Sequence, residues 1–408
     1  MNKLKKNIFT MRSQKIILIL SMVALLTAIT KGTYLEVLAK YINTAGMLYV
    51  LLIFPYYFLK LNDFDKITRH IVLAILVMTV IQTIRSFLYP DLQLAGNLYF
   101  TLFGNEYCML SMIIPIFICL SQSERTLMTL KSITLIFCTI GVFCYFILDS
   151  PIYFSSWVAT AFLPYYSKKQ KIVVFIVYAI MFYGALFAEE AYRTNLVVLC
   201  VFVITLAYFI FKFSRQFLSL ICCGMMIIPL IYLVITLLNP SYSIIQLIME
   251  ELSNNTNNSD FATDTRTFLF VEMVDDLNKN NAWFWGKGAR AGYMSQYFWN
   301  LTSDGGDHWY RLTSEVGVLH YLLRGGLTFM MCFYGLIFYA VSKVLKYGRN
   351  KFVMSIAILA SGWIFISCFS FLHGFNMTLV GFFMILGCCL SKKWLNKSDE
   401  EITQMFMS

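Results

Sequence analysis

Charged residues are scarce in this chain of 408 residues: they make up 13% of it, whereas hydrophobic residues make up 59%. The mean hydropathy is accordingly positive, at +0.68. A soluble domain of this length has no interior large enough to bury so much apolar surface, so the composition excludes the soluble classes. It predicts an all-α polytopic membrane protein whose helices are solvated by the lipid bilayer.

Acidic residues are the scarcer charge: 22 stand against 32 basic ones, and the net charge is +10. Such a balance also occurs in nucleic-acid-binding proteins. Here the basic residues stand in short links between apolar runs, as the positive-inside rule expects of a membrane protein. The sequence therefore predicts no nucleic-acid partner.

Several motifs of cofactor-dependent enzymes are missing. The longest polar stretch contains no HExxH, no Walker-type phosphate loop, no GxSxG, no zinc-ligand cluster and no DxD-like motif for nucleotide sugars. The eleven cysteines have no CxxC spacing, and nearly all lie in apolar runs, where free cysteine packs as a small hydrophobe. The sequence therefore predicts no metal, no nucleotide and no other cofactor, and no disulfide framework.

Apolar runs of about 20 residues, the length that crosses a bilayer, recur along the chain and predict about twelve transmembrane helices. The predicted spans are 16–31, 44–60, 70–89, 97–120, 132–149, 151–166, 172–189, 194–212, 217–238, 322–342, 352–371 and 373–391, of which 151–166 is short and a candidate re-entrant segment. With the N-terminus inside, most of the basic residues fall on the cytoplasmic side. Both termini are then cytoplasmic.

The predicted organisation has four parts. Residues 1–238 hold nine transmembrane helices, and 239–311 form one large extracytoplasmic loop. Residues 312–391 hold an interfacial helix and the last three spans, and 392–408 form a cytoplasmic tail. Since spans are surrounded by lipid, we expect the specific chemistry in the large polar loop and at the outer membrane face.

Ionisable residues near the predicted spans gather at that outer face. Arg85 ends the third span, Glu106 lies in the outer half of the fourth, and Arg193 opens the eighth. Charged groups at membrane depth are costly and usually mark function. The alternative for each alone is an interfacial residue whose charged end reaches water, and Arg193 has a further alternative in pairing with Glu189 or Glu190.

The large loop supplies further cations. Arg266 opens a predicted short helix that runs to Leu277, with Asp264 or Thr265 as its N-cap. The apolar positions expected to rest on the core are Phe268, Phe270, Val271 and Val274, and Asp275–Asp276 is expected to be a solvated helix end.

The segment WFWGKGARAGY follows, and its glycines at 286, 288 and 292 permit close approach of the backbone to a ligand. Together with Lys287 and Arg290 this segment predicts a pyrophosphate site, because backbone N–H groups and guanidinium forks suit phosphate oxygens. An ordinary turn is the alternative.

The stretch 308–324 predicts a helix that ends at Gly325–Gly326. On it His308, Arg311 and Glu315 share one face at i, i+3 and i+7. His320 and Arg324 form a second pair at i and i+4. Histidine is the natural proton acceptor near neutral pH, so His308 is the first candidate for a general base and Glu315 the second.

Three segments together resemble the bacterial O-antigen polymerase and O-antigen ligase superfamily. They are AYRTNLVVL, then DTRTFLFVEMVDDL with WFWGKGAR, then DHWYRLTSEVGVLHYLLRGGLTF. The number of predicted spans and the single large external loop late in the chain agree with that family. The ligase pattern places asparagine directly after the histidine, whereas Trp309 follows His308 here, which favours a polymerase.

The resemblance implies a metal-independent, integral-membrane glycosyltransferase of the GT-C type. Its donor is an undecaprenyl-pyrophosphate-linked oligosaccharide, its place is the outer face of the bacterial inner membrane, and a chain-length regulator and a flippase are candidate partners. We expect Arg193, Arg266 and Arg290 to bind the donor pyrophosphate. The remaining predicted binding residues are Lys287, Arg311, His320, Arg324, Arg85 and Glu106. The alternatives are an O-antigen ligase and a lipid-linked oligosaccharide transporter, which would show internal repeats and midplane charges.

Overall fold

The computed structural model describes residues 58–88, 112–148, 156–187, 193–211, 213–238, 267–289, 291–296, 310–311, 314, 316–368 and 377–407, with short pieces between 16 and 53. The described elements are helices, apart from one pair of two-residue strands, which confirms the all-α class.

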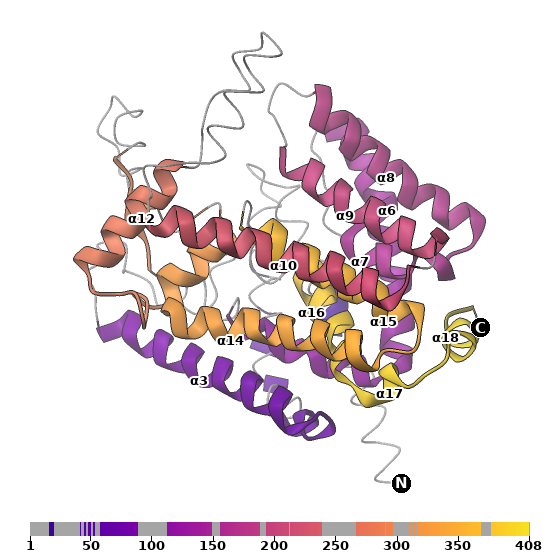
Figure 1. The fold of residues 1–408 in the computed structure, drawn as a ribbon, viewed down its shortest axis with the longest axis horizontal. Coiled ribbons are helices and arrows are strands. Elements are labelled where there is room, and N and C mark those ends of the chain that lie inside the picture. The colour runs from indigo at the N-terminus through magenta and orange to yellow at the C-terminus, as the bar shows by residue number, and fades with distance from the viewer. Residues whose placement is uncertain are drawn as a thin grey trace.

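The helices lie as a bundle in which several long members run side by side (Figure 1). The α-helices are α3 (Lys66–Leu88), α6 (Glu124–Leu148), α7 (Ser156–Ala161), α8 (Lys168–Phe187), α9 (Arg193–Phe211), α10 (Arg215–Leu238), α12 (Thr267–Lys279), α14 (Gly317–Tyr347), α15 (Lys351–Ser367), α16 (Met377–Leu390), α17 (Lys392–Leu395) and α18 (Asp399–Met407). The other described elements are the 3-10 helices η1 (Leu61–Asp63), η2 (Ile114–Gln122) and η3 (Leu163–Tyr165) and the strands β1 (Tyr293–Met294) and β2 (Tyr310–Arg311).

Within the described residues, four helices are long and apolar enough to cross a membrane. These segments are Lys66–Ser86, Glu124–Val142, Arg215–Leu238 and Gly317–Tyr347, and shorter apolar helices cover Leu196–Phe211, Lys351–Ser367 and Thr378–Leu390. They indicate a multi-pass membrane protein. Of the twelve predicted spans, 16–31, 44–60 and 97–120 lie mainly outside the described residues.

The predicted span over 151–166, expected to be short and a candidate re-entrant segment, is not a continuous helix in its described part. It consists of α7, a buried helix of six residues, followed directly by η3. A helix as short as α7 does not cross a bilayer by itself, and Pro164 in η3 interrupts the regular helix after it. The Tyr166 hydroxyl donates to the Lys131 carbonyl of α6 (3.0 Å), so this buried segment ends beside the first turns of α6.

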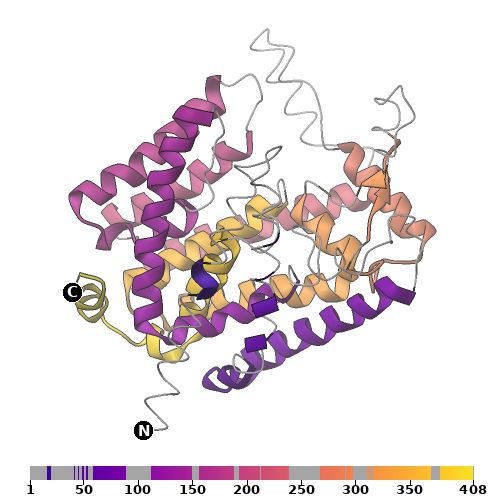
Figure 2. The same cartoon turned by 180° about the vertical axis from the view of Figure 1, so that it is seen from behind.

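Helix α15 lies at the centre of the bundle. All of its residues except Lys351 and Phe365 are buried, and α9, α10, α14 and α16 pack around it (Figures 1 and 2). A helix that is apolar on every side requires such enclosure. Its serines are compatible with burial because they donate to carbonyls of the same helix, as Ser361 does to Ala357 (2.8 Å).

Helices α3 and α14 run alongside each other in both views (Figures 1 and 2). The buried side of α3 is apolar in its first half and mostly polar in its second half, with Thr79, Gln82, Thr83 and Ser86. The three hydroxyls each donate to the carbonyl four residues back (2.8–2.9 Å). The exposed side is apolar, which is the arrangement of a helix that faces lipid.

One end of the bundle collects basic links. Asp65 caps α3 by accepting from the Thr68 N–H (2.9 Å) and forms an ion pair with Lys343 near the end of α14. Arg215, at the start of α10, donates to the carbonyls of Lys346 (3.2 Å) and Gly348 (2.5 Å). The contacts therefore place the starts of α3 and α10 beside the end of α14.

The C-terminal segment packs against this same end, so residues 392–407 are more than the simple tail expected from the sequence. Trp394 is fully buried and its indole N–H donates to the Ser121 carbonyl (2.8 Å). Asn350 caps α15 through the Val353 N–H and donates to the carbonyls of Trp394 (2.9 Å) and Lys397 (3.0 Å). The link before α15 is thus bonded to the C-terminal segment.

Candidate functional site

The candidate site begins with α12, the helix predicted in the polar loop. It starts at Thr267, within one residue of the predicted start, and its buried positions include Leu269, Phe270, Met273 and Leu277. These positions recur at helical spacing and form one face. Of the predicted apolar contacts, Phe270 and Val274 are buried and Phe268 packs partly buried against the core. Amphipathic periodicity therefore predicts this helix correctly.

A tight turn over 282–289 follows α12. It is initiated by Asn281 in the left-handed region (φ 49°) and by the Ala282 N–H, which donates to the Leu277 carbonyl (2.9 Å). The Gly286 N–H then donates to the Ala282 carbonyl (2.7 Å). We call residues 282–289 the docking turn.

The docking turn packs against a break in α14 and supplies hydrogen-bond partners to the backbone there. Gly326 interrupts this helix with φ 67° and ψ −173°, which removes helical partners from backbone groups on both sides of it. A buried backbone group without a hydrogen-bond partner costs free energy comparable to a lost hydrogen bond. The break therefore needs partners from elsewhere in the chain.

Four backbone hydrogen bonds supply these partners. On one side of the break, the N–H groups of Lys287 and Gly288 donate to the Leu323 and Arg324 carbonyls (2.7 and 3.1 Å). On the other side, the N–H groups of Leu327 and Thr328 donate to the Trp283 and Phe284 carbonyls (2.8 and 3.2 Å). The pairing resembles a short strand ladder built between a turn and a helix.

Glycine permits the close approach of these backbones. A methyl group on Gly286 would overlap the Arg324 carbonyl, and one on Gly326 would overlap the Phe284 carbonyl. Both glycines also have positive φ, a region that other residues rarely adopt. These glycines bring the docking turn against the chain's own α14, and the predicted approach of the backbone to a ligand stays a prediction.

The turn also binds α3. The Trp285 carbonyl accepts from Gln82 Nε2 (2.6 Å) and from Arg85 Nη1 (2.9 Å), and the Ala289 N–H donates to the Gln82 carbonyl (3.1 Å). Arg85 was predicted as a binding residue, and the structure shows it holding the docking turn. Gln82 was missed, although its place in a polar stripe at helical spacing (79, 82, 83, 86) signals a buried polar face.

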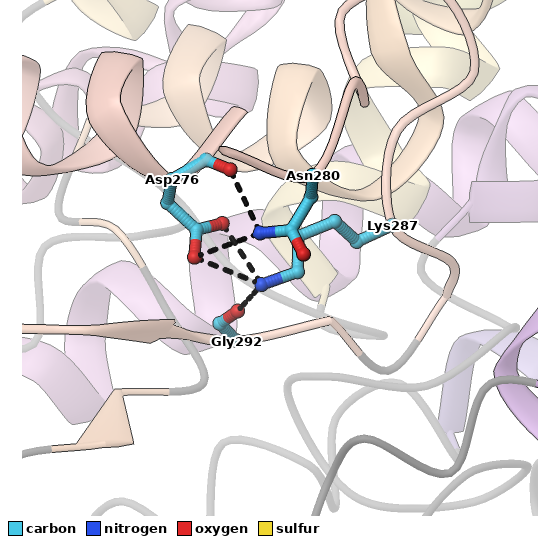
Figure 3. Close-up of polar contacts among 4 residues, drawn as sticks. All are labelled: Asp276, Asn280, Lys287 and Gly292. Atoms are coloured by element: carbon cyan, nitrogen blue, oxygen red, sulfur yellow. Dashed lines mark hydrogen bonds and ion pairs between the residues drawn. The ribbon is translucent and has the colours of Figure 1, made fainter. Parts of the chain in front are cut away.

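Lys287 forms an ion pair and hydrogen bonds within the protein. Its ammonium group binds both oxygens of Asp276 (2.8 and 3.0 Å) and the Gly292 carbonyl (2.9 Å), as Figure 3 shows. Asp276 also has its backbone carbonyl bonded to Asn280 Nδ2 (2.8 Å). The predicted pyrophosphate contact of Lys287 stays a prediction, whereas the interpretation of Asp276 as a solvated helix end is corrected, because its side chain is mostly buried.

Burial governs the protonation of Asp276. Removal of its carboxyl group from water raises its pKa above the ordinary value, and the hydrogen bonds and charge of Lys287 only partly oppose this shift. The pair joins the end of α12 to the docking turn, with both side chains mostly buried (15% and 16% exposed).

His320 and Arg324 lie on the first half of α14. Every residue from Gly317 to Gly326 is buried, and both side chains are fully buried. This half-helix therefore lies inside the protein, and its predicted position at the membrane interface stays a prediction. The predicted i, i+4 relation of His320 and Arg324 is confirmed, since the helix is continuous between them.

Arg311 departs from its prediction. It lies on β2 and is paired with Tyr293 of β1, while Tyr310 is paired with Met294. A helix over 308–324 is therefore wrong at Tyr310–Arg311, and α14 begins only at Gly317. Arg311 cannot share a helical face with residues on either side of it.

The remaining predicted site residues lie outside what the structure describes. These residues are Glu106, Arg266, Arg290, His308 and Glu315. Arg193 begins α9, in agreement with its predicted place at a helix start, but its side chain is not among those described. The described site therefore consists of the docking turn, the α14 break, the buried pair His320 and Arg324, and the polar end of α3.

No protein-family model, curated protein or solved structure matches this chain.

Proposed function

We propose that this protein is a membrane polysaccharide polymerase. It transfers a glycan chain from undecaprenyl pyrophosphate to a lipid-linked repeat unit at the outer face of the bacterial inner membrane. The observation that carries this proposal is the fully buried pair His320 and Arg324 on a half-helix beside an aromatic-rich turn. Buried ionisable groups on a discontinuous membrane helix mark ligand sites and catalytic sites.

The proposed glycosyl transfer needs one base and several cations. An acceptor sugar hydroxyl attacks the anomeric carbon of the donor, and the new carbon–oxygen bond forms as the bond to the phosphate oxygen breaks. The proton passes to one base, with His308 first and Glu315 second. The pyrophosphate leaves as an anion that arginines neutralise, so it requires no proton. Arg324 joins Arg193, Arg266 and Arg290 as a candidate for that role because it is buried next to the α14 break.

The proposed topology has twelve passes and two cytoplasmic termini, with 151–166 crossing as a broken segment inside the protein. Support for this pass comes from the Tyr166 contact with Lys131, a predicted inner residue. The contacts of Asp65, Arg215 and Asn350 likewise gather basic links predicted to be inner at one end of the bundle. Basic residues retained on one side fit the positive-inside rule.

A transporter of lipid-linked oligosaccharide is the second candidate. The broken helix α14 favours it, because transporters also bind substrates at discontinuous helices. A ligase would use the same donor and a different lipid acceptor. The three functions differ in product: only a polymerase lengthens the glycan on its polyprenyl carrier.

Substitution of Arg324 tests the proposal. Lysine keeps the charge but loses the planar fork, so Arg324→Lys should shorten the polymer and Arg324→Ala should abolish it. Arg349→Lys, an exposed change at the opposite end, is the matched control and should leave chain length normal. The readout is polysaccharide chain length on gels, at equal amounts of tagged protein in the membrane. Full-length polymer from Arg324→Ala would remove Arg324 from the mechanism.

A further inference from the structure

The tip of the docking turn carries two exposed aromatic side chains. Phe284 is 66% exposed and Trp285 is 50% exposed, whereas their neighbour Trp283 is partly buried and its indole N–H donates to Asn278 Oδ1 (2.7 Å). Large apolar side chains that stay exposed side by side indicate a contact surface for a partner.

The backbone under this tip is held at both residues. The Phe284 carbonyl accepts from the Thr328 N–H (3.2 Å) and hydroxyl (2.7 Å), and the Trp285 carbonyl accepts from Gln82 and Arg85. The two rings are therefore presented by a fixed turn. A partner that binds them does not have to order the loop first.

The position of the tip identifies that partner. The exposed face of α3 is apolar through Val77, Val80 and Ile84, which are 49%, 49% and 52% exposed. Arg85 follows Ile84 directly and donates to the Trp285 carbonyl (2.9 Å), so the tip lies at the last turns of this apolar face. Tryptophan and arginine at the end of a lipid-facing helix are the residues of the membrane–water interface.

The nearby charge does not oppose insertion. Lys287, the next charged residue along the turn, is mostly buried in its ion pair with Asp276. The charge of Lys287 is thus already paired within the protein, as Figure 3 shows for its contacts with Asp276.

From these observations we propose that Phe284 and Trp285 form an interfacial anchor that inserts into the phospholipid headgroup and upper acyl region. The anchor fixes the depth of the docking turn, and with it the α14 break, relative to the bilayer. This inference requires only that the protein spans a membrane, so it is independent of the proposed enzymatic activity.

Fluorescence quenching by brominated lipids tests the anchor. The full-length protein is reconstituted into phosphatidylcholine vesicles with bromine either shallow or deep on the acyl chains. Trp285→Phe should lose part of the lipid-quenchable tryptophan emission, and the loss should be larger with the shallow label. Trp283→Phe, at the partly buried neighbour, is the control and should lose less. In the Trp285→Phe background, Phe284→Trp should restore quenching.

Other occupants of the tip give different results. If Trp285→Phe leaves lipid quenching unchanged and lowers quenching by aqueous iodide instead, the ring lies in water and the proposal is wrong. The proposal is also wrong if the quenching lost with Trp285 varies with protein density in the vesicles, because that result would indicate a second copy of the chain.

Discussion

Gly326 and Gly335 lie in the same helix but in different environments. Gly326 has a left-handed φ of 67°, and a side chain there would overlap the Phe284 carbonyl. A side chain at Gly335 would meet nothing within 4 Å. The two positions therefore separate the effect of the docked break from the general effect of removing a glycine from α14.

We expect Gly326→Ala to lower the thermal unfolding midpoint of the purified protein in detergent, because the added methyl group expels the docking turn and strains the backbone. Gly335→Ala should leave the midpoint unchanged or raise it, since alanine favours a helix by about 1 kcal/mol over glycine. Equal midpoints for the two variants would contradict the role assigned to the break.

At the residue scale, local spacing predicts which residues lie in a turn or on a helix better than it predicts which residues they contact. The glycines of the docking turn, the arginine at 85 and the helical pair of His320 and Arg324 all follow from spacing. The partner of Lys287 does not, because Asp276 lies eleven positions away and meets it only when the turn folds back on α12. Ion pairs that depend on tertiary folding leave no local pattern.

At the scale of helices and strands, local periodicity predicts the elements whose buried positions repeat within one short segment. Helix α12 is predictable because its buried positions repeat at helical spacing within one short segment. Strand β2 was missed because only its pairing with β1, some way back along the chain, makes Tyr310–Arg311 extended. The break in α14 was predicted correctly at the two glycines. Its burial inside the protein depends on the docking turn, whose contact with α14 leaves no local pattern in the sequence.

The ion pair between Asp65, directly before α3, and Lys343 of α14 gives a prediction for how stability depends on pH. Partial burial raises the pKa of Asp65, but hydrogen bonds from Lys343 and the Thr68 N–H, with the Lys343 charge, lower it below the ordinary value. A lowered folded pKa stabilises the native state above the unfolded pKa, near 3.9, and this contribution is lost as pH falls through the folded value. Thermal midpoints should therefore fall on acidification below about pH 4.

The variant Asp65→Asn should show a smaller fall than the parent protein over that range. Asp63→Asn is the control, because Asp63 is exposed and its ion pair with Lys60 is loose (3.7 Å), so it contributes little. If Asp65→Asn and the parent protein lose stability in parallel as pH falls, the ion pair with Lys343 does not join the two helices as described.

Within the part of the chain that the structure describes, exposed apolar side chains and basic links lie in different regions. Apolar side chains are exposed along α3 and α10, and basic links meet at the end where α17 and α18 pack. The membrane class could be predicted from composition, and the described helices agree with it. The number of regular spans could not be fixed in the same way, because a buried segment such as 151–166 has the apolar composition of a span without its continuous helix.

Reporter fusions test the proposed topology. A fusion within the large loop at Asn257 should report the extracytoplasmic side, and a fusion at Ser408 should report the cytoplasm. Paired enzymatic reporters that are active on opposite sides provide the measurement. Location of both positions in one compartment would contradict the twelve-pass arrangement.

Reconstituted polymerisation tests the central claim most directly. The purified protein in proteoliposomes is supplied with undecaprenyl-pyrophosphate-linked repeat units alone, and the products are resolved by gel and mass spectrometry. The account predicts a ladder of polyprenyl-linked multiples, and His308→Ala should reduce its formation about 10²–10⁴-fold, as loss of a general base typically does. If the repeat units cross the bilayer or remain single, with no longer product, the protein is not a polymerase.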